Sequence, residues 1–190
     1  MKSRGLLLPI AAPSGTGKTT VCHELLKIDK RFIFSVSCTT RAPRPGELDG
    51  VDYHFISQAQ FLANIREGKM AEWQEVFGNF YGTLKTSIDE SLTKNQILLL
   101  DIDAKGALNL KKLYSKVTIS IFLLPPGKDE LDRRLLKRGT DDSHSIALRK
   151  ARIPDELELS KQFDYQVVND QLRNTVRQII QIIEEHFKND

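Results

Sequence analysis

The chain has 190 residues, of which 40% are hydrophobic and 28% charged. This composition excludes a disordered chain, and the length argues against two large independent domains. The 28 Lys and Arg residues against 25 Asp and Glu give a net charge of +3, which is too small for the strongly basic surface of a nucleic-acid-binding protein. Any anion-binding site must therefore be local.

The cysteine content and the apolar runs indicate a cytoplasmic protein. Cys22 and Cys38 are the only cysteines, and without a CxxC pair or a nearby His pair they predict neither a disulfide framework nor a zinc site. The longest apolar runs are far below the 18 or so residues needed to cross a bilayer. Lys2 and Arg4, followed by residues 6–12, loosely resemble a signal peptide, but the apolar stretch is too short. We expect neither a membrane nor a nucleic-acid partner.

Short apolar runs alternate with longer stretches of helical period along most of the chain. This pattern is typical of βαβ units and of an α/β fold with a mostly parallel sheet covered on both faces. Pro9 removes one donor from what should be a central strand, so a local irregularity is expected there. The last predicted helix is the clearest because apolar residues recur on one face from Val176 to Phe187. The predicted strands are 6–11, 34–36, 97–100, 117–123 and 165–168, and helices are predicted to begin near residues 18, 104, 128, 143 and 170.

Two segments interrupt the alternation. Residues 37–94 carry turn chemistry at Pro43, Pro45, Gly46 and Asp49-Gly50 and are interpreted as an inserted subdomain. Residues 128–161 are charged and helical, and their simplest interpretation is a solvated helical hairpin. We therefore expect a single domain over residues 1–190, with a core formed by residues 1–36, 95–127 and 162–190.

The sharpest local signal is a phosphate loop between the first strand and the first helix. Its glycines would let consecutive N–H groups point at phosphate oxygens, and the helix N-terminus adds further donors. Lys18 would neutralise the β- and γ-phosphates, and the Thr19 hydroxyl would bind Mg²⁺. The strict pattern has Gly where this chain has Ala12. The loop reads Ala12, Pro13, Ser14, Gly15, Thr16, Gly17, Lys18 and Thr19.

A second polar element follows the buried strand at 97–100. Asp101 ends that strand and Asp103 lies two residues on, at the edge of the sheet where ligands bind in open α/β folds. Asp101 could hold Mg²⁺ directly or through water. Alternatively, either carboxylate, and Asp103 more readily, could cap the helix beginning near residue 104.

A phosphate loop alone fits a GTPase, an ATP-driven motor or a small kinase, and the inserted segment distinguishes them. It contains TTRAPRPGE at 39–47, DYHF at 52–55, EW at 72–73 and GNFYGT at 78–83. With LDIDAKGA at 100–107, LPP at 124–126 and VVND at 167–170, these motifs resemble guanylate kinases over almost the whole chain. The resemblance implies a P-loop NTPase-type three-layer fold, with a GMP-binding insertion at about 37–94 and a helical lid at about 128–161.

The resemblance also implies which residues bind GMP. Arginine forks and phenol hydroxyls match phosphate oxygens, and a carboxylate can accept from guanine N1–H and the exocyclic amine together. Adenine offers no such pairing, so the site would reject it. Without the resemblance, Arg41 and Arg44 would be exposed turn residues and Glu72 a surface carboxylate. The implied phosphate ligands are Arg41, Arg44, Tyr53 and Tyr81; Glu72, Ser37 and Thr83 are assigned to guanine; and Asp101 and Asp103 lie between the guanosine and the metal.

On the ATP side, the resemblance assigns catalytic roles to Lys18, Arg41, Arg134 and Arg149, with the last two reaching the transferring phosphoryl group from the lid. Arg138 and Asn169 match adenine contacts, whereas Arg133 and Arg152 are interpreted as solvated charges. The implied enzyme is an ATP:GMP phosphotransferase that uses Mg²⁺ and accepts dGMP as well. A non-catalytic interaction module of the same fold is the alternative, and association into a homo-oligomer is left open.

Overall fold

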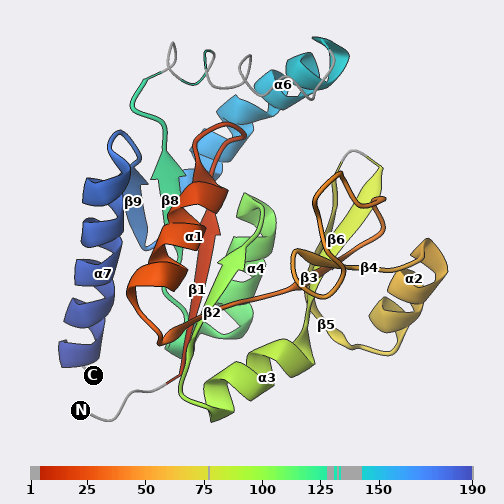
Figure 1. Ribbon diagram of the computed structural model, residues 1–190, viewed down its shortest axis with the longest axis horizontal. Coiled ribbons are helices and arrows are strands. Elements are labelled where there is room, and N and C mark those ends of the chain that lie inside the picture. The colour runs from red at the N-terminus through yellow and green to blue at the C-terminus, as the bar shows by residue number, and fades with distance from the viewer. Residues whose placement is uncertain (1–4, 77, 128–130, 132, 134–142, 190) are drawn as a thin grey trace.

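The computed structural model describes residues 5–76, 78–127, 131, 133 and 143–189. It contains two β-sheets side by side (Figure 1). The larger has five strands in the order β2-β7-β1-β8-β9, and the smaller has four in the order β4-β3-β6-β5.

The five-stranded sheet is parallel throughout and forms the middle of three layers, as the sequence predicts. Alternate residues of its central strand point to opposite faces: Leu6, Leu8 and Ile10 pack in one cluster and Leu7 and Ala11 in another. Its strands are β1 (Leu6–Ala11), β2 (Phe32–Phe34), β7 (Ile97–Asp101), β8 (Ile121–Leu124) and β9 (Tyr165–Val168).

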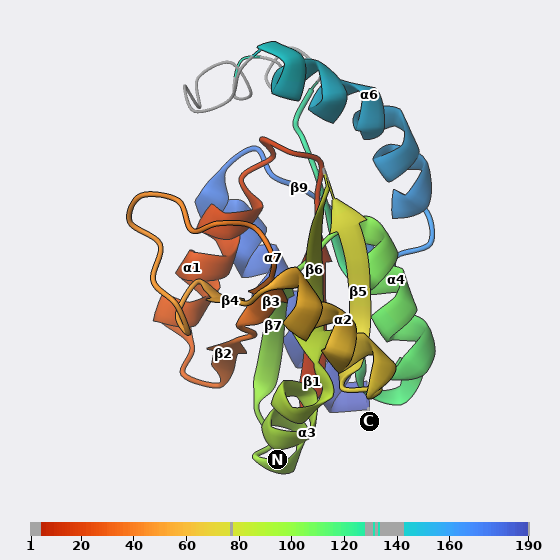
Figure 2. The ribbon, with the colours of Figure 1, turned by 90° about the vertical axis from the view of Figure 1, so that its right-hand side faces the viewer.

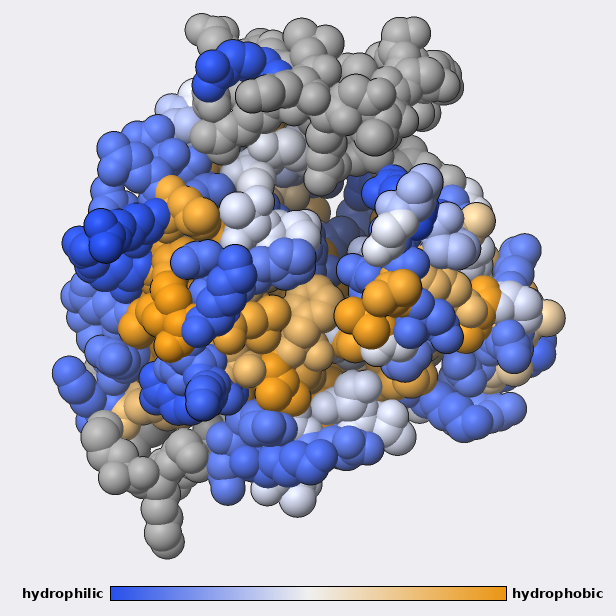
Figure 3. Space-filling model, in the orientation of Figure 1, coloured by the Kyte–Doolittle hydropathy of each residue, from blue (hydrophilic) through white to orange (hydrophobic). Residues whose placement is uncertain are grey.

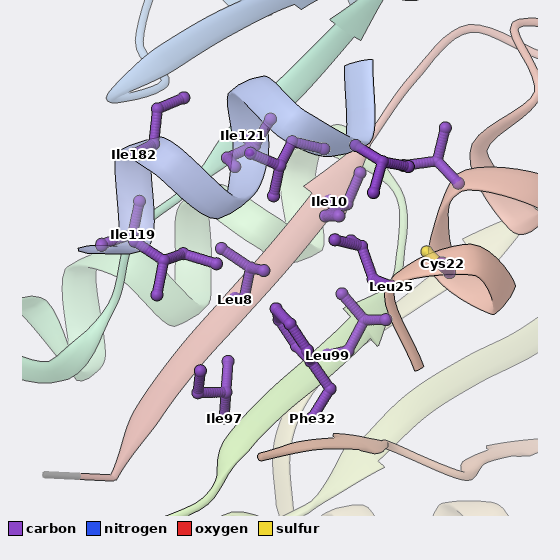
Figure 4. Packing of buried hydrophobic residues seen from close by; sticks show 14 of the residues in the cluster. Leu8, Ile10, Cys22, Leu25, Phe32, Ile97, Leu99, Ile119, Ile121 and Ile182 are labelled. Atoms are coloured by element: carbon purple, nitrogen blue, oxygen red, sulfur yellow. The ribbon is translucent and has the colours of Figure 1, made fainter. Parts of the chain in front are cut away.

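Helices cover both faces of this sheet. On one face, α1 (Lys18–Ile28) and α7 (Leu172–Asn189) pack together. Their buried apolar side chains form one cluster with those of the strands, and Figure 4 shows part of it. The other face is covered by α3 (Lys85–Thr93) and α4 (Ala104–Leu113). Burial of the apolar side chains between these layers, each worth roughly 1.5–3 kcal/mol, holds the core together.

Pro9 interrupts one ladder of the central strand, as expected. The Leu7 carbonyl accepts from the N–H of Ile119 on the β8 side, and Pro9, two residues on, faces the same side without a donor. The pairing with β8 resumes at Ile10 and Ala11. The strand predicted at 117–123 therefore begins later, at Ile121.

The strand predicted at 34–36 is also displaced. It lies at Phe32–Phe34, because after the Ser35 N–H bonds to the Leu99 carbonyl the chain leaves for the second sheet. Residues 115–117, where the strand at 117–123 was expected to begin, form a short 3₁₀ helix, Ser115–Val117.

The smaller sheet is built within the inserted segment (Figure 2). It contains β3 (Ser37–Thr39), β4 (Tyr53–Phe55), β5 (Met70–Val76) and β6 (Asn79–Leu84), and α2 (Gln58–Arg66) packs on it through Phe61. Helix α2 begins with a capping box between Ser57 and Gln60. Helix α3 also lies within residues 37–94, but it packs against β1 and β7 of the larger sheet.

Helix α6 (Ser143–Ser160) begins at Ser143, where the sequence predicted a helix start. It lies above the ends of both sheets in Figure 1. The helix predicted to begin near residue 128 lies outside the described residues. No helix in the described part of the chain is long and apolar enough to cross a membrane.

Both cysteines are buried free thiols. Cys22 lies on the buried face of α1 in the core, and Cys38, on β3, packs in one cluster with Phe61 of α2. Burial raises the pKa of Cys22 well above its usual value, and burial with the nearby charge of Asp49 raises the pKa of Cys38 to about 11. Neither thiol is paired, in agreement with the sequence.

Candidate active site

A cavity of about 340 Å³ opens between the two sheets and under α6, and Figure 3 shows the hollow with hydrophilic residues at its back. The larger sheet contributes the phosphate loop and the residues that follow β7. The smaller sheet contributes polar and aromatic side chains from β3, β4, β5 and β6. The predicted residues that line it are Ala12, Pro13, Ser14, Gly15, Gly17, Lys18, Thr19, Ser37, Arg44, Tyr53, Glu72, Tyr81, Asp101 and Asp103.

The phosphate loop has the backbone that its glycines predict. Gly15 and Gly17 adopt positive φ values of 88° and 94°, which a side chain would disfavour. Gly17 lies at the N-terminus of α1, so the free N–H groups of that helix point into the loop. Ala12 is absent from the positive-φ positions of the described chain, so its departure from the strict glycine pattern introduces no backbone strain.

Lys18, Asp101 and Thr19 form one polar network at the mouth of the loop. The Lys18 ammonium contacts Asp101 Oδ1 at 2.7 Å and donates to the Ile102 carbonyl at 2.7 Å. The Thr19 hydroxyl donates to Asp101 Oδ2 at 3.1 Å. Burial acts to lower the pKa of Lys18, but the charge and hydrogen bond of Asp101 outweigh it and the pKa is raised. Lys18 is therefore a cation at neutral pH.

Thr19 and Asp101 also fit a bound Mg²⁺. Their oxygens lie 3.1 Å apart, and neighbouring ligands of an octahedral ion with bonds of about 2.1 Å are about 3.0 Å apart. Among the residues that the structure describes, no cluster of three or more His, Cys, Asp or Glu side chains is arranged to hold a metal. A magnesium ion here would thus take its remaining ligands from phosphate oxygens and water, as is usual for this ion.

Asp103 does cap a helix. Its Oδ1 accepts from the N–H groups of Lys105 and Gly106 at the start of α4. Asp103 also lines the cavity. Its carboxylate can therefore face a bound ligand while Oδ1 stabilises the helix. Asp101 has no capping role, because α4 begins after Asp103.

Of the predicted phosphate ligands in the inserted segment, Arg44, Tyr53 and Tyr81 line the cavity, and Arg41 lies beside Tyr53 without lining it. Arg41 pairs through both terminal nitrogens with Glu47, at 2.8 and 2.9 Å, and its guanidinium lies 5.4 Å from the centre of the Tyr53 ring. The Tyr53 and Tyr81 rings meet edge to face. Arg44 lines the cavity, and its backbone N–H donates to Glu47 Oε2. Glu47 thus orients the Arg41 guanidinium and holds the backbone at Arg44. It belongs to the motif at 39–47, but the sequence alone assigned it no role.

Glu72 is buried at the other end of the cavity, with 6% of its surface exposed. Thr83 lies opposite it on β6 and donates to Glu72 Oε1 at 2.7 Å. Burial raises the pKa of Glu72 to about 7, with a further contribution from Asp103 and in spite of the hydrogen bonds from Thr83. The sequence alone favoured a surface position, which is wrong. Ser37 is likewise buried and lines the cavity, whereas Thr83 lies behind Glu72.

Asn169 lies beneath the phosphate loop. Its Nδ2 donates to the Thr16 carbonyl at 2.6 Å, and its Oδ1 accepts from the Thr175 hydroxyl at 3.0 Å. The side chain is buried and is absent from the cavity wall. The structure therefore gives Asn169 a supporting position under the loop.

Helix α6 contributes two residues that the sequence interpretation missed. Arg152 and Glu156 line the cavity and lie 3.8 Å apart, whereas Arg152 had been interpreted as a solvated charge. Burial raises the pKa of Glu156, against the attraction of Arg152 and Lys18. Arg149 lies in α6, but its side chain, like the whole of Arg134 and Arg138, lies outside the described residues.

Comparisons with known proteins show the family of the chain. The family model of guanylate kinase matches residues 4–186. A guanylate kinase of Streptococcus agalactiae is 45% identical, covering 100% of this chain and 91% of its own. One from Wolinella succinogenes is 41% identical, covering 95% and 84%. The crystal structure of guanylate kinase from Anaplasma phagocytophilum superposes with a TM-score of 0.82 at 32% identity, covering 98% and 88%. The chain belongs to the guanylate kinase family of phosphate-transferring enzymes.

Proposed function

We propose that the protein transfers the γ-phosphate of ATP to GMP, giving ADP and GDP, and so supplies guanine nucleotides for GTP and dGTP synthesis. The observation that carries this proposal is one cavity with two unlike halves. A phosphate loop with Lys18 lies on the core side, and a buried carboxylate, Glu72, lies on the inserted sheet opposite. Two nucleotides bound end to end would bring their phosphates together between these halves.

The chemistry requires alignment and charge neutralisation. A phosphate oxygen of GMP attacks the γ-phosphorus in line with the leaving ADP oxygen, and no covalent nucleophile is needed. Lys18, already a cation, would neutralise the β- and γ-phosphates. Thr19 and Asp101 would hold Mg²⁺, which supplies further positive charge to the phosphates. Arg41 and Arg44, with the tyrosines beside them, would bind the GMP phosphate, and the lid residues Arg134, Arg138 and Arg149 would reach the ATP side.

Glu72 gives a physical basis for choosing guanine. In its ionised form it accepts from guanine N1–H and the exocyclic amine, and Ser37 can donate to O6. Adenine would leave the buried carboxylate with Thr83 but without the two donors of guanine, and a site built around such partners can discriminate by up to about 10⁴-fold. dGMP keeps the same base and is expected to be accepted.

A protein-interaction module without catalysis is the alternative. The formed phosphate loop and the Lys18–Asp101–Thr19 network favour the kinase, because a module that only binds a peptide would have no use for them.

The decisive test is a coupled assay of ADP release with ATP, Mg²⁺ and each nucleoside monophosphate. We expect release with GMP and dGMP and little with AMP, UMP or CMP. Lys18→Ala should lower kcat by about 10³-fold, by analogy with other phosphate-stabilising groups. Lys94→Ala, at an exposed position of the chain, is the matched control and should retain full activity. A folded wild-type protein without GMP-dependent ADP release would refute the proposal.

A further inference from the structure

Gly106 lies in the first turn of α4, where a glycine is unexpected. It is the third residue of α4, and glycine is among the poorest helix-forming residues. Its φ is not positive, so the backbone here is open to any residue. Its N–H donates to Asp103 Oδ1, which an alanine would do equally well. The reason for glycine must be the space beside it.

That space is filled by the Glu72 carboxylate. A Cβ built on Gly106 would lie 2.5 Å from Glu72 Oε2 and 3.3 Å from its carboxyl carbon. Real Cβ atoms do not approach other heavy atoms closer than about 3.0 Å. The first turn of α4, which belongs to the core, therefore packs directly on the carboxylate carried by β5 of the inserted sheet.

The carboxylate has no easy way to move aside. Its Oε1 is held by the Thr83 hydroxyl at 2.7 Å, and the side chain is almost fully buried. Turning Oε2 away from an added methyl group would lengthen or break the bond to Thr83. Thr83 and Gly106 thus fix the plane of the carboxylate from two sides.

We propose that Gly106 is a specificity-determining residue, whose missing side chain sets the Glu72 carboxylate in the plane that reads guanine. Each carboxylate oxygen has two lone-pair sites, so Oε1 keeps one site beside its bond from Thr83, and Oε2 keeps its own. Guanine offers two parallel donors, N1–H and the exocyclic amine, and a fixed plane lets both oxygens accept together. This inference rests on the proposed GMP kinase function.

The test compares GMP with inosine monophosphate, which keeps N1–H but lacks the exocyclic amine. In Gly106→Ala the carboxylate is displaced, and the second hydrogen bond is lost first. We expect the ratio of kcat/KM for GMP to that for inosine monophosphate to fall about tenfold or more, as for the loss of a hydrogen bond to a charged group. The KM for ATP should stay within about twofold.

A control separates this effect from general damage to the helix. Lys105→Ala changes the neighbouring, exposed residue of the same turn and should leave the ratio unchanged. Equal losses on both substrates in Gly106→Ala, or no change, would overturn the inference. If the wild type itself shows no GMP-dependent turnover, the proposed function fails, and this result is distinct from an unchanged ratio in an active enzyme.

A double-mutant cycle keeps the inference testable if Gly106→Ala folds poorly. Glu72→Asp withdraws the carboxylate by one methylene, about 1.5 Å, and so makes room for the methyl group. We expect Gly106→Ala to lower the Tm by fewer degrees in the Glu72→Asp background than in the wild type. It should likewise lower kcat/KM for GMP by a smaller factor in that background. Additive effects would show that the methyl group acts elsewhere than on the carboxylate, and would overturn the inference.

Discussion

Burial of Glu72 makes stability depend on its charge. The folded protein raises the pKa of this carboxyl from 4.5 to about 7, so between these pH values the folded state binds more protons than the unfolded chain. The free energy of unfolding therefore falls as the pH rises through this window, by about 3 kcal/mol in total at 1.36 kcal/mol per pKa unit. Ionised Glu72 opposes folding of the nucleotide-free protein, although guanine requires that form.

Glu72→Gln should remove this dependence, since an amide does not titrate. We expect its stability relative to the wild type to increase by about 3 kcal/mol between pH 4.5 and pH 8, measured by urea unfolding. Glu75→Gln, at an exposed position of the same strand, is the control and should show a much smaller change. A Glu72→Gln advantage that is equal at both pH values would contradict the assignment.

Individual residues also show what the sequence could and could not predict at the site. Lys18, Thr19 and Asp101 could be predicted from the sequence. The first two begin the helix after one buried strand and Asp101 ends another, and the carboxyl ends of parallel strands lie at the same edge of a sheet. Glu72 could not be recognised as buried without the family resemblance, since its burial depends on α4 packing on β5. Arg152 and Glu156 were missed because a charged helix looks solvated until its position over the cavity is known.

At the scale of elements, the hydrogen bonds of Asn169 connect the phosphate loop to the last helix. Asn169 follows β9 and joins the Thr16 carbonyl to Thr175 of α7, so it ties the loop to the last helix. Asn169→Ala would leave a buried carbonyl without this donor, which costs about 1–3 kcal/mol, and the looser loop should raise the KM for ATP more than that for GMP.

Chemical denaturation and steady-state kinetics on Asn169→Ala would check this expectation. Asn174→Ala provides the matched control, because Asn174 is exposed on α7 and its side chain donates to the nearby Gln171 at the start of that helix. If Asn169→Ala and Asn174→Ala were equally stable and kept the same KM for ATP, the bracing role would be wrong.

The order of strands and helices in the core could be predicted because short, fully apolar runs mark strands buried on both faces. The displaced strand boundaries depend on contacts between distant parts of the chain, which the apolar pattern alone does not reveal. The ladder to β8 is broken by Pro9, a residue over a hundred positions away in the chain. In the inserted segment, the pairing of β3 with both β4 and β6 joins distant residues, so turn residues could mark the insertion but not its sheet.

For the whole molecule, the cavity is lined by residues of both sheets, and a ligand that binds only the folded protein should stabilise it. At a GMP concentration about 100 times its Kd, binding adds about 2.7 kcal/mol. For a domain of this size that corresponds to a rise in Tm of about 5–10 °C, which thermal unfolding with and without GMP would measure.

The same measurement distinguishes the two nucleotide sites. Glu72→Ala should lose most of the GMP-induced shift at the same concentration but retain the shift caused by ATP with Mg²⁺, because the phosphate loop lies on the other sheet. Retention of the full GMP shift in this variant would remove Glu72 from the base site.

The two buried thiols make the chain well suited to spectroscopic labelling. Thiol reagents attack the thiolate, and both Cys22 and Cys38 combine burial with a raised pKa, so neither should react at neutral pH. Cysteines introduced at the exposed positions Ala59 on α2 and Gln178 on α7 would then be the only sites to take up dyes. Energy transfer between those dyes would report the separation of the two sheets directly, in a protein that keeps its native cysteines.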